Sequence, residues 1–156
     1  MESLLAAIEA TGPAQYLRVS RLGYAAVSGA HILGIAFLVG AVLPLNLRLL
    51  GFWPSISRAN LLRVLVPVAA IGLVLAALTG SLLFSVRAQE YVAIGYFQVK
   101  LVLVFVGLLS AVTTHRAYGL TLEGASEHQL RFHALLSLGC WLGALACGRM
   151  IAFAVD

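Results

Sequence analysis

The sequence predicts an all-helical (all-α) integral membrane protein: a four-helix up-down bundle with an N-terminal interfacial amphipathic helix. Two observations predict this class. First, the chain of 156 residues is 62% hydrophobic and 10% charged, with a mean hydropathy of +1.00, whereas soluble domains carry about 25% charged residues. Second, it contains four apolar stretches long enough to cross a hydrocarbon core, which takes about 20 helical residues.

We interpret residues 1–156 as a single membrane domain. Residues 1–21 have apolar positions on one helical face and a break at Thr11-Gly12-Pro13, which is typical of an interfacial segment at the membrane surface. The spans are predicted at residues 22–47, 64–86, 97–116 and 132–155. Because the links are short, consecutive spans run antiparallel and both chain ends lie on one side.

The first two spans are defined by the absence of charge over residues 22–47 and 64–86. Small residues along the first span favour close approach of another helix. Pro67 falls in the first turn of the second span, where proline is tolerated. Thr79 belongs to a hydroxyl-bearing end of the second span, which can form hydrogen bonds to another helix.

The last two spans carry signals of the interface and of helix packing. Tyr91 and the aromatic residues after it resemble an aromatic belt, so the third span is placed after them, with Lys100 able to snorkel from a shallow position. The alternative begins this span at Tyr91. In the fourth span small residues recur every four positions, at Gly139, Gly143 and Cys147, and they predict a face for close helix contact.

The charged residues point to lipid and away from nucleic acid. Ten Lys and Arg against six Asp and Glu give a net charge of +4. The basic residues are scattered between apolar runs, so we expect contacts with anionic headgroups and no nucleic-acid partner. They divide five to five between the two sides of the bundle, so the positive-inside rule does not fix the orientation. Met1-Glu2-Ser3 lacks the positive charge of a secretory leader, and we expect no cleaved peptide.

Two histidines could form a cofactor site in the last hairpin. His115 and His133 lie nine residues either side of Gly124, so antiparallel helices place them at a similar depth. Two imidazoles from facing helices could be the axial ligands of haem b. His128 could replace His133, or form a metal site with His115 and Glu127. The alternative is that these histidines only hydrogen-bond to neighbouring groups and hold the helices together.

His31 lies on the first span, near the opposite side of the membrane from His115. Met150 on the returning fourth span is expected near its level, which would allow a second haem or a copper site with His and Met ligands. Cys140 and Cys147 are seven residues apart on one helix. That spacing corresponds to about 10.5 Å of helix axis, too far for a disulfide.

Several motifs together resemble a known family. They are His31-Ile32-Leu33-Gly34, Gly40, Leu47-Arg48-Leu49-Leu50-Gly51, Thr79-Gly80-Ser81-Leu82-Leu83-Phe84, Phe97-Gln98-Val99-Lys100-Leu101 and His115. In this order, over residues 22–118, they resemble a family of small bacterial four-helix membrane proteins known only as a domain of unknown function. A more distant similarity, in architecture alone, is to four-helix membrane cytochromes b and copper-resistance membrane proteins.

The resemblance implies a multi-pass protein of the bacterial inner (cytoplasmic) membrane. It implies candidate sites at His31, Arg48, Lys100 and His115 but names no reaction. The chain departs from the family at Ser28, where an acidic residue often precedes the histidine. It also departs at Asn46, where aspartate is usual. Both changes remove a carboxylate, which weakens any acid-dependent role here.

The leading functional hypothesis is a membrane redox protein that binds haem b and passes electrons between a membrane quinone and a redox partner protein. His115 and His133 would be the axial ligands and His31 a second-site ligand. Arg48 or Lys100 would pair with haem propionates or lipid headgroups.

Two alternatives from other classes stay open. One is a non-catalytic accessory or assembly subunit whose glycine-rich faces pack in a homo-oligomer or a larger membrane complex. The other is a membrane protein that binds copper or another transition metal through His31, Met150 and the cysteines. No catalytic residue is assigned, because the sequence has no serine nucleophile elbow, phosphate loop or HExxH motif.

Overall fold

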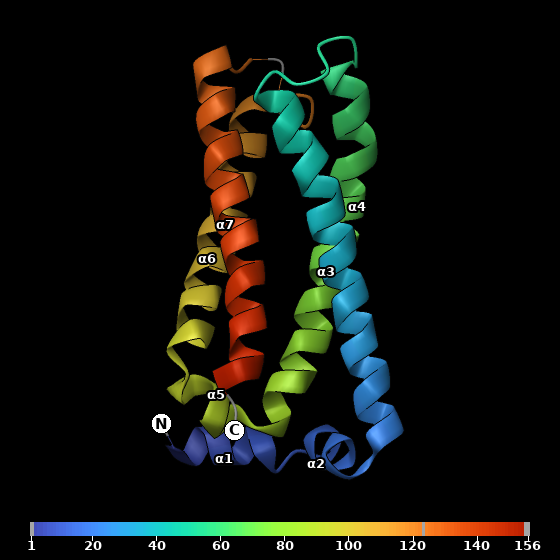
Figure 1. Ribbon diagram of the computed structural model, residues 1–156, viewed down its shortest axis with the longest axis vertical. Helices are drawn as coiled ribbons and strands as arrows, with labels where there is room; N and C mark the ends of the chain where they lie inside the picture. Colours follow the sequence, from blue (N-terminus) through green and yellow to red (C-terminus); the bar gives the residue numbers. More distant parts are fainter. Residues whose placement is uncertain (1, 123, 155–156) are drawn as a thin grey trace.

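The computed structural model describes residues 2–122 and 124–154, which form helices and no strand. Four long helices stand side by side, and the remaining short helices lie at one end, which we call the lower end (Figure 1). In chain order the helices are α1 (Glu2–Glu9), α2 (Gly12–Val19), α3 (Arg21–Leu49), α4 (Arg58–Val86), α5 (Ala88–Ala93), α6 (Gly95–Tyr118) and α7 (Glu127–Ala154).

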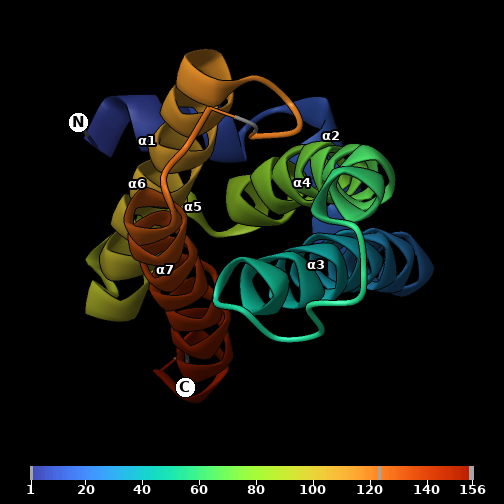
Figure 2. The same ribbon diagram turned by 90° about the horizontal axis from the view of Figure 1, so that it is seen from above.

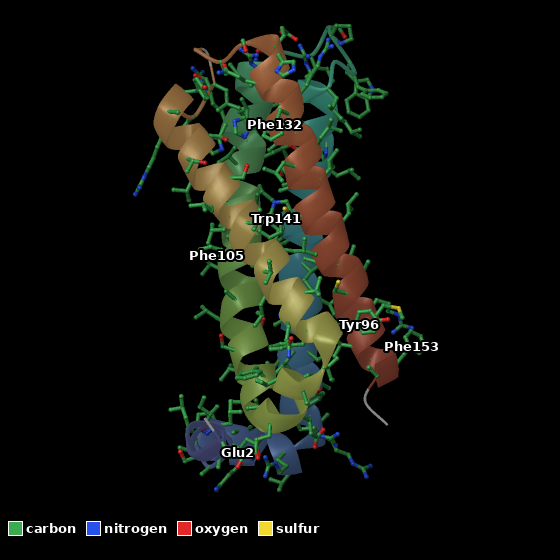
Figure 3. All side chains as sticks on the ribbon, turned by 90° about the vertical axis from the view of Figure 1, so that its left-hand side faces the viewer. Glu2, Tyr96, Phe105, Phe132, Trp141 and Phe153 are labelled. Atoms are coloured by element: carbon green, nitrogen blue, oxygen red, sulfur yellow. The ribbon has the colours of Figure 1, made fainter. Side chains whose placement is uncertain are left out.

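The four long helices, α3, α4, α6 and α7, are long and apolar enough to cross a membrane. Large apolar side chains project outward from them: Phe105 is 66% exposed and Phe153 is 67% exposed, whereas Trp141 lies between helices at 6% (Figure 3). Monomeric soluble proteins rarely expose contiguous apolar surface on this scale. The prediction of a helical protein with four helices able to span a membrane is confirmed.

Two of the four long helices begin more than one turn earlier than the apolar pattern predicted. α4 begins at Arg58 instead of residue 64, because the Ser57 hydroxyl caps it by accepting a hydrogen bond from a first-turn amide at 3.4 Å. α7 begins at Glu127 instead of residue 132. There Ser126 and Gln129 form a capping box, with bonds of 3.0 and 3.3 Å. The predicted end of the last span, residue 155, lies outside the described residues.

The predicted surface segments form separate short helices. Of the predicted interfacial segment, residues 2–19 give α1 and α2, divided at Ala10 and Thr11, with Pro13 in the first turn of α2. Arg21 already begins α3. Tyr91 lies on α5, and α6 begins only at Gly95. Tyr91 therefore lies before α6, whereas Tyr96 and Phe97, which follow it in the predicted aromatic belt, belong to α6.

Backbone contact between α3 and α4 is allowed by Gly34 and Gly72. A Cβ atom on Gly34 would lie 2.6 Å from the Ala76 nitrogen, and one on Gly72 would lie 2.5 Å from the Leu38 nitrogen. Real Cβ atoms do not come this close to backbone atoms. The two helices therefore cross with their backbones in close contact at this level. Figure 1 shows the crossing of α3 and α4.

The α6–α7 hairpin packs less closely, because side chains of α7 fill the space beside Gly107 of α6. A Cβ atom on Gly107 would lie 3.2 Å from Cβ of Cys140 and 3.3 Å from the Trp141 ring. The two hairpins meet where α3 packs against α7 (Figure 2). There the buried Asn46 side chain donates from Nδ2 to Oγ of Ser137 at 2.9 Å.

The backbones of α4 and α6 do not pack against each other within the described ranges. Side chains join these helices at the lower end, where the rings of Phe84 and Phe97 stack with centroids 5.3 Å apart. Tyr91 packs against Phe97 at 5.7 Å. The aromatic residues predicted as an interfacial belt thus close the lower end between α4 and α6.

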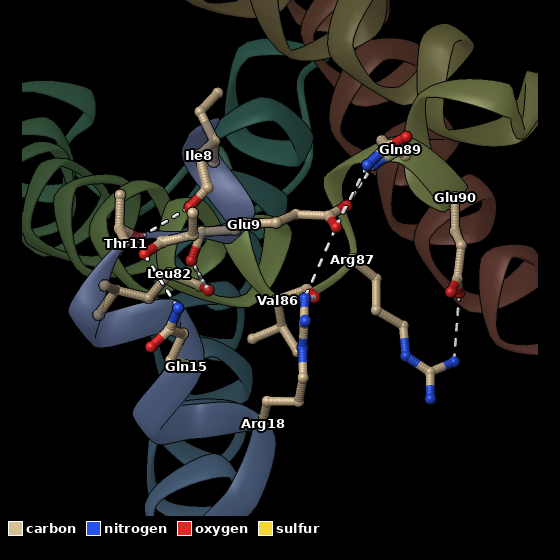
Figure 4. Close-up of polar contacts among 12 residues, drawn as sticks. Ile8, Glu9, Thr11, Gln15, Arg18, Leu82, Val86, Arg87, Gln89 and Glu90 are labelled. Carbon is tan, nitrogen blue, oxygen red and sulfur yellow. Dashed lines mark hydrogen bonds and ion pairs between the residues drawn. The ribbon is translucent and has the colours of Figure 1, made fainter. Parts of the chain in front are cut away.

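The helices α1 and α2 form an N-terminal platform across the lower end (Figure 1). Arg18 donates from Nη2 to the Val86 carbonyl oxygen at 2.6 Å, which satisfies the last residue of α4 (Figure 4). Glu9 lies 3.6 Å from the same guanidinium and accepts a hydrogen bond from the Gln89 amide at 2.9 Å. These contacts fix the platform to the junction of α4 and α5.

Replacing Gly34 with alanine tests the helix crossing. We expect Gly34→Ala to destabilise the protein by about 1–3 kcal/mol, because the new methyl group overlaps the α4 backbone. The measurement is the Tm of the purified protein in detergent. Gly40→Ala is the matched control on the same helix, since nothing lies within 4 Å of a Cβ there. Equal melting temperatures for the two variants would contradict the observed crossing.

Candidate functional site

A cleft of about 440 Å³ separates the two hairpins in the upper half of the molecule, and we call it the hairpin cleft. This volume is within the range of small-molecule sites. Its walls are mostly leucine, valine and alanine from all four long helices. The polar side chains that line it are Asn46, Ser110, Thr114, His115, Arg116, His133 and Ser137. Because α4 and α6 do not pack together, we infer that the cleft opens between them.

His133 lines the hairpin cleft and is held by α6. Its Nδ1 lies 3.1 Å from Oγ1 of Thr114 and 3.5 Å from Oγ of Ser110. The Thr114 hydroxyl donates its own hydrogen to the Ser110 carbonyl oxygen at 2.7 Å, so the Thr114 oxygen is left to accept. We therefore assign the proton of neutral His133 to Nδ1, which leaves the lone pair on Nε2.

His115 lines the same cleft, one residue beyond Thr114. Its Nδ1 lies 3.4 Å from the carbonyl oxygen of Gly119, which can only accept, so this ring also carries its proton on Nδ1. The prediction that His115 and His133 lie at one depth is confirmed. His128, the alternative to His133, is exposed in the first turn of α7 and does not line the cleft.

His31 occupies a different place, in the lower half between α3 and α4. Its Nδ1 lies 2.9 Å from the Ala76 carbonyl oxygen and 3.1 Å from Oγ1 of Thr79. The Thr79 hydroxyl donates to the Leu75 carbonyl oxygen at 2.6 Å, so His31 is the donor to both groups. Gly80 makes room for the ring, since a Cβ there would lie 2.9 Å from Cε1 of His31. The predicted hydrogen bond from the hydroxyl-bearing end of α4 to another helix is confirmed.

Lys100 also lies in the lower half, on α6, and its side chain crosses Gly148 of α7. Its Cδ, Cε and Nζ atoms lie 3.9, 3.8 and 3.6 Å from the position that a Gly148 Cβ would take. Lys100 belongs to neither of the two ion pairs found among the described residues.

Arg48 and Met150 lie apart from both histidine sites. The Arg48 guanidinium donates to the carbonyl oxygens of Ile56 and Pro54 at 2.7 and 3.3 Å, and so holds the loop that follows α3. It lines a smaller cavity of about 290 Å³ together with Arg58. Met150 is 42% exposed on α7, whereas both hydrogen bonds of His31 go to α4.

Some residues of the cleft were not predicted as site residues. Asn46 could have been predicted from the sequence, because it is an amide at the end of an apolar run. In the structure its side chain is buried, with 5% exposed. Arg116 could have been noticed as the neighbour of His115. Thr114 and Ser137 had no signal, because hydroxyls in apolar helices usually bond to their own backbone.

Within residues 2–122 and 124–154, no group of three or more His, Cys, Asp or Glu side chains is arranged to hold a metal ion. Two imidazoles that line one apolar cleft, by contrast, offer the nitrogen ligands that haem iron binds. No protein-family model, curated protein or solved structure matches this chain.

The contact between α3 and α7 can be tested at Asn46. We expect Asn46→Leu to lower stability by about 0.5–1.5 kcal/mol, because the change keeps the volume but removes the hydrogen bond to Ser137. The measurement is the Tm in detergent. Asn60→Leu, at an exposed position of α4, is the control. A Tm of Asn46→Leu equal to that of the unmodified protein would show that this bond does not hold the hairpins together.

Proposed function

We propose that the protein is a multi-pass redox protein of the bacterial inner membrane that holds haem b in the hairpin cleft, with His115 and His133 as axial ligands. One observation carries the proposal: both imidazoles line a single apolar cleft, and hydrogen bonds engage Nδ1 of each ring. The Nε2 atoms are thereby left for iron. Ligand histidines are commonly oriented by such a bond from the other ring nitrogen.

The rest of the cleft fits the same cofactor. Leucine, valine and alanine walls suit an apolar macrocycle, and Arg116 supplies a positive charge for a propionate. Arg116 takes this role in place of Arg48, whose guanidinium is bound to its own loop. Haem, when bound, supplies reversible one-electron chemistry at iron. The task of this chain is to orient the ligands and to exclude water.

The proposed partners are a membrane quinone and a redox protein. A quinone is soluble in the hydrocarbon phase, and the opening inferred between α4 and α6 gives it a lateral approach to the cleft. His31 stays a candidate ligand at a second site, because its Nε2 is also left free by the bond from Nδ1 to Ala76.

An absorption spectrum of the detergent-purified protein, oxidised and then reduced with dithionite, tests this function. We expect a Soret band at stoichiometric iron in the unmodified protein. We expect its loss in His133→Ala, because that variant removes an axial ligand. His128→Ala is the matched control, since this imidazole is exposed and outside the cleft. Thr114→Val should keep haem but alter the band positions, because it removes only the acceptor of the Nδ1 proton.

A spectrum without a Soret band, from folded protein made in haem-replete cells, would overturn the haem proposal. It would favour a second function, that of an accessory subunit in a membrane complex. The observation behind this alternative is that Gly29, Gly40 and Gly139 have nothing within 4 Å of their Cβ positions, so the outer surface keeps small positions against which another helix could pack.

A further inference from the structure

Below its histidines the hairpin cleft is lined by two further polar side chains, Ser137 and Trp141. They follow His133 at intervals of four residues, so all three lie on the same face of α7. We propose that Ser137 and Trp141 bind the carbonyl oxygen of a quinone ring. This site serves the quinone partner of the proposed function and rests on that function in this respect alone, since it needs no haem.

Trp141 has a hydrogen-bond donor without an acceptor. The side chain is 6% exposed, and its Cε2 and Cζ2 atoms lie 3.3 and 3.4 Å from the position that a Gly107 Cβ would take. Within residues 2–122 and 124–154 the indole Nε1 has no hydrogen-bond partner, although a buried tryptophan usually finds one. No fully buried nitrogen or oxygen of a described side chain is unpartnered, so Nε1 keeps some accessible surface. We infer that this surface faces the cleft, because Trp141 lines it.

Ser137 supplies a second donor at the same wall. Its Oγ accepts a hydrogen bond from Nδ2 of Asn46 at 2.9 Å. Thr79 and Thr114 each donate their own hydrogen to a carbonyl oxygen of their own helix, whereas the Ser137 hydroxyl has no acceptor among the described residues. An incoming hydrogen bond polarises a hydroxyl and strengthens the bond that it donates. Asn46 therefore prepares Ser137 to donate to a ligand in the cleft.

The depth of these donors selects the ligand. Trp141 lies near the middle of α7, which runs from Glu127 to Ala154. The ester carbonyls of phospholipids stay in the interfacial region, far from the middle of a helix that crosses the membrane. A carboxylate would need a cation, and Arg116, the only Lys or Arg among the residues that line the cleft, lies at the upper end of α6. A quinone is uncharged, dissolves in hydrocarbon and has carbonyl oxygens that only accept.

The quinone site and the proposed haem site lie at different depths. Trp141 is eight residues beyond His133, which corresponds to about 12 Å along the axis of α7. Leu38 and Leu73 line the same lower part of the cleft and provide apolar contacts for a ring. A ring that accepts from Trp141 therefore leaves the imidazole of His133 free to bind iron.

The test compares duroquinone with durene, two tetramethyl-substituted rings that differ only where the quinone carries its oxygens. Each compound is titrated into the purified protein in a neutral detergent, and the rise in Tm gives its affinity. We expect duroquinone to bind the unmodified protein more tightly than durene does. We expect Trp141→Phe to bind duroquinone about threefold to tenfold more weakly, because it keeps an aromatic ring but loses a hydrogen bond. Trp53→Phe is the matched control, since Trp53 is 47% exposed and does not line the cleft.

Equal affinities for duroquinone and durene, or equal affinities of Trp141→Phe and the unmodified protein for duroquinone, would overturn the proposal. If Trp141→Phe does not fold, Ser137→Ala takes its place, because it removes the other donor. The comparison of the two compounds on the unmodified protein needs no variant. Tight duroquinone binding without a Soret band would support this site and overturn haem alone, and a Soret band without duroquinone binding would do the reverse.

Discussion

The backbone contact between α3 and α4 at Gly34 and Gly72 is the constraint on which the rest of the structure depends. Because neither position has a side chain, the helices cross closely and then diverge in both directions (Figure 1). Below the crossing, His31 reaches the Ala76 carbonyl oxygen on α4. Above it, Leu38 and Leu73 form the beginning of the hairpin cleft. One crossing thus creates a closely packed polar site on one side and an apolar space on the other.

Both hairpins use a hydroxyl to fix a histidine. Thr79 and Thr114 each donate to a carbonyl oxygen of their own helix, so each oxygen can only accept from the imidazole that faces it. An intrahelical bond of this kind is common and almost neutral in energy. Here, however, the intrahelical bond leaves the hydroxyl oxygen only able to accept from the facing imidazole. It therefore decides which ring nitrogen of His31 and of His133 keeps a lone pair. The same two contacts join the helices of each pair.

The sequence predicted the number, order and apolar character of the long helices, because length and lack of charge are local properties. It also placed His115 and His133 at one depth, which follows from counting residues in an antiparallel hairpin. It missed the early starts of α4 and α7, since Ser57 and Ser126 cap polar turns that carry no apolar pattern. It did not anticipate that Arg48 would bind its own loop or that Asn46 would bond to Ser137. The bond of Asn46 depends on how the two hairpins dock, and the bonds of Arg48 depend on the conformation of the loop after α3. An apolar pattern records neither of them.

The N-terminal platform has a consequence for the order of assembly during synthesis. Arg18 bonds to the Val86 carbonyl oxygen, 68 residues further along the chain, and Glu9 bonds to the Gln89 amide, 80 residues further. The platform leaves the ribosome before α4 and α5, so the end of α4 and the start of α5, to which it docks, are not yet present. We therefore expect it to wait undocked and to attach only to a finished α3–α4 hairpin, so that its docking marks the completion of the first half of the protein.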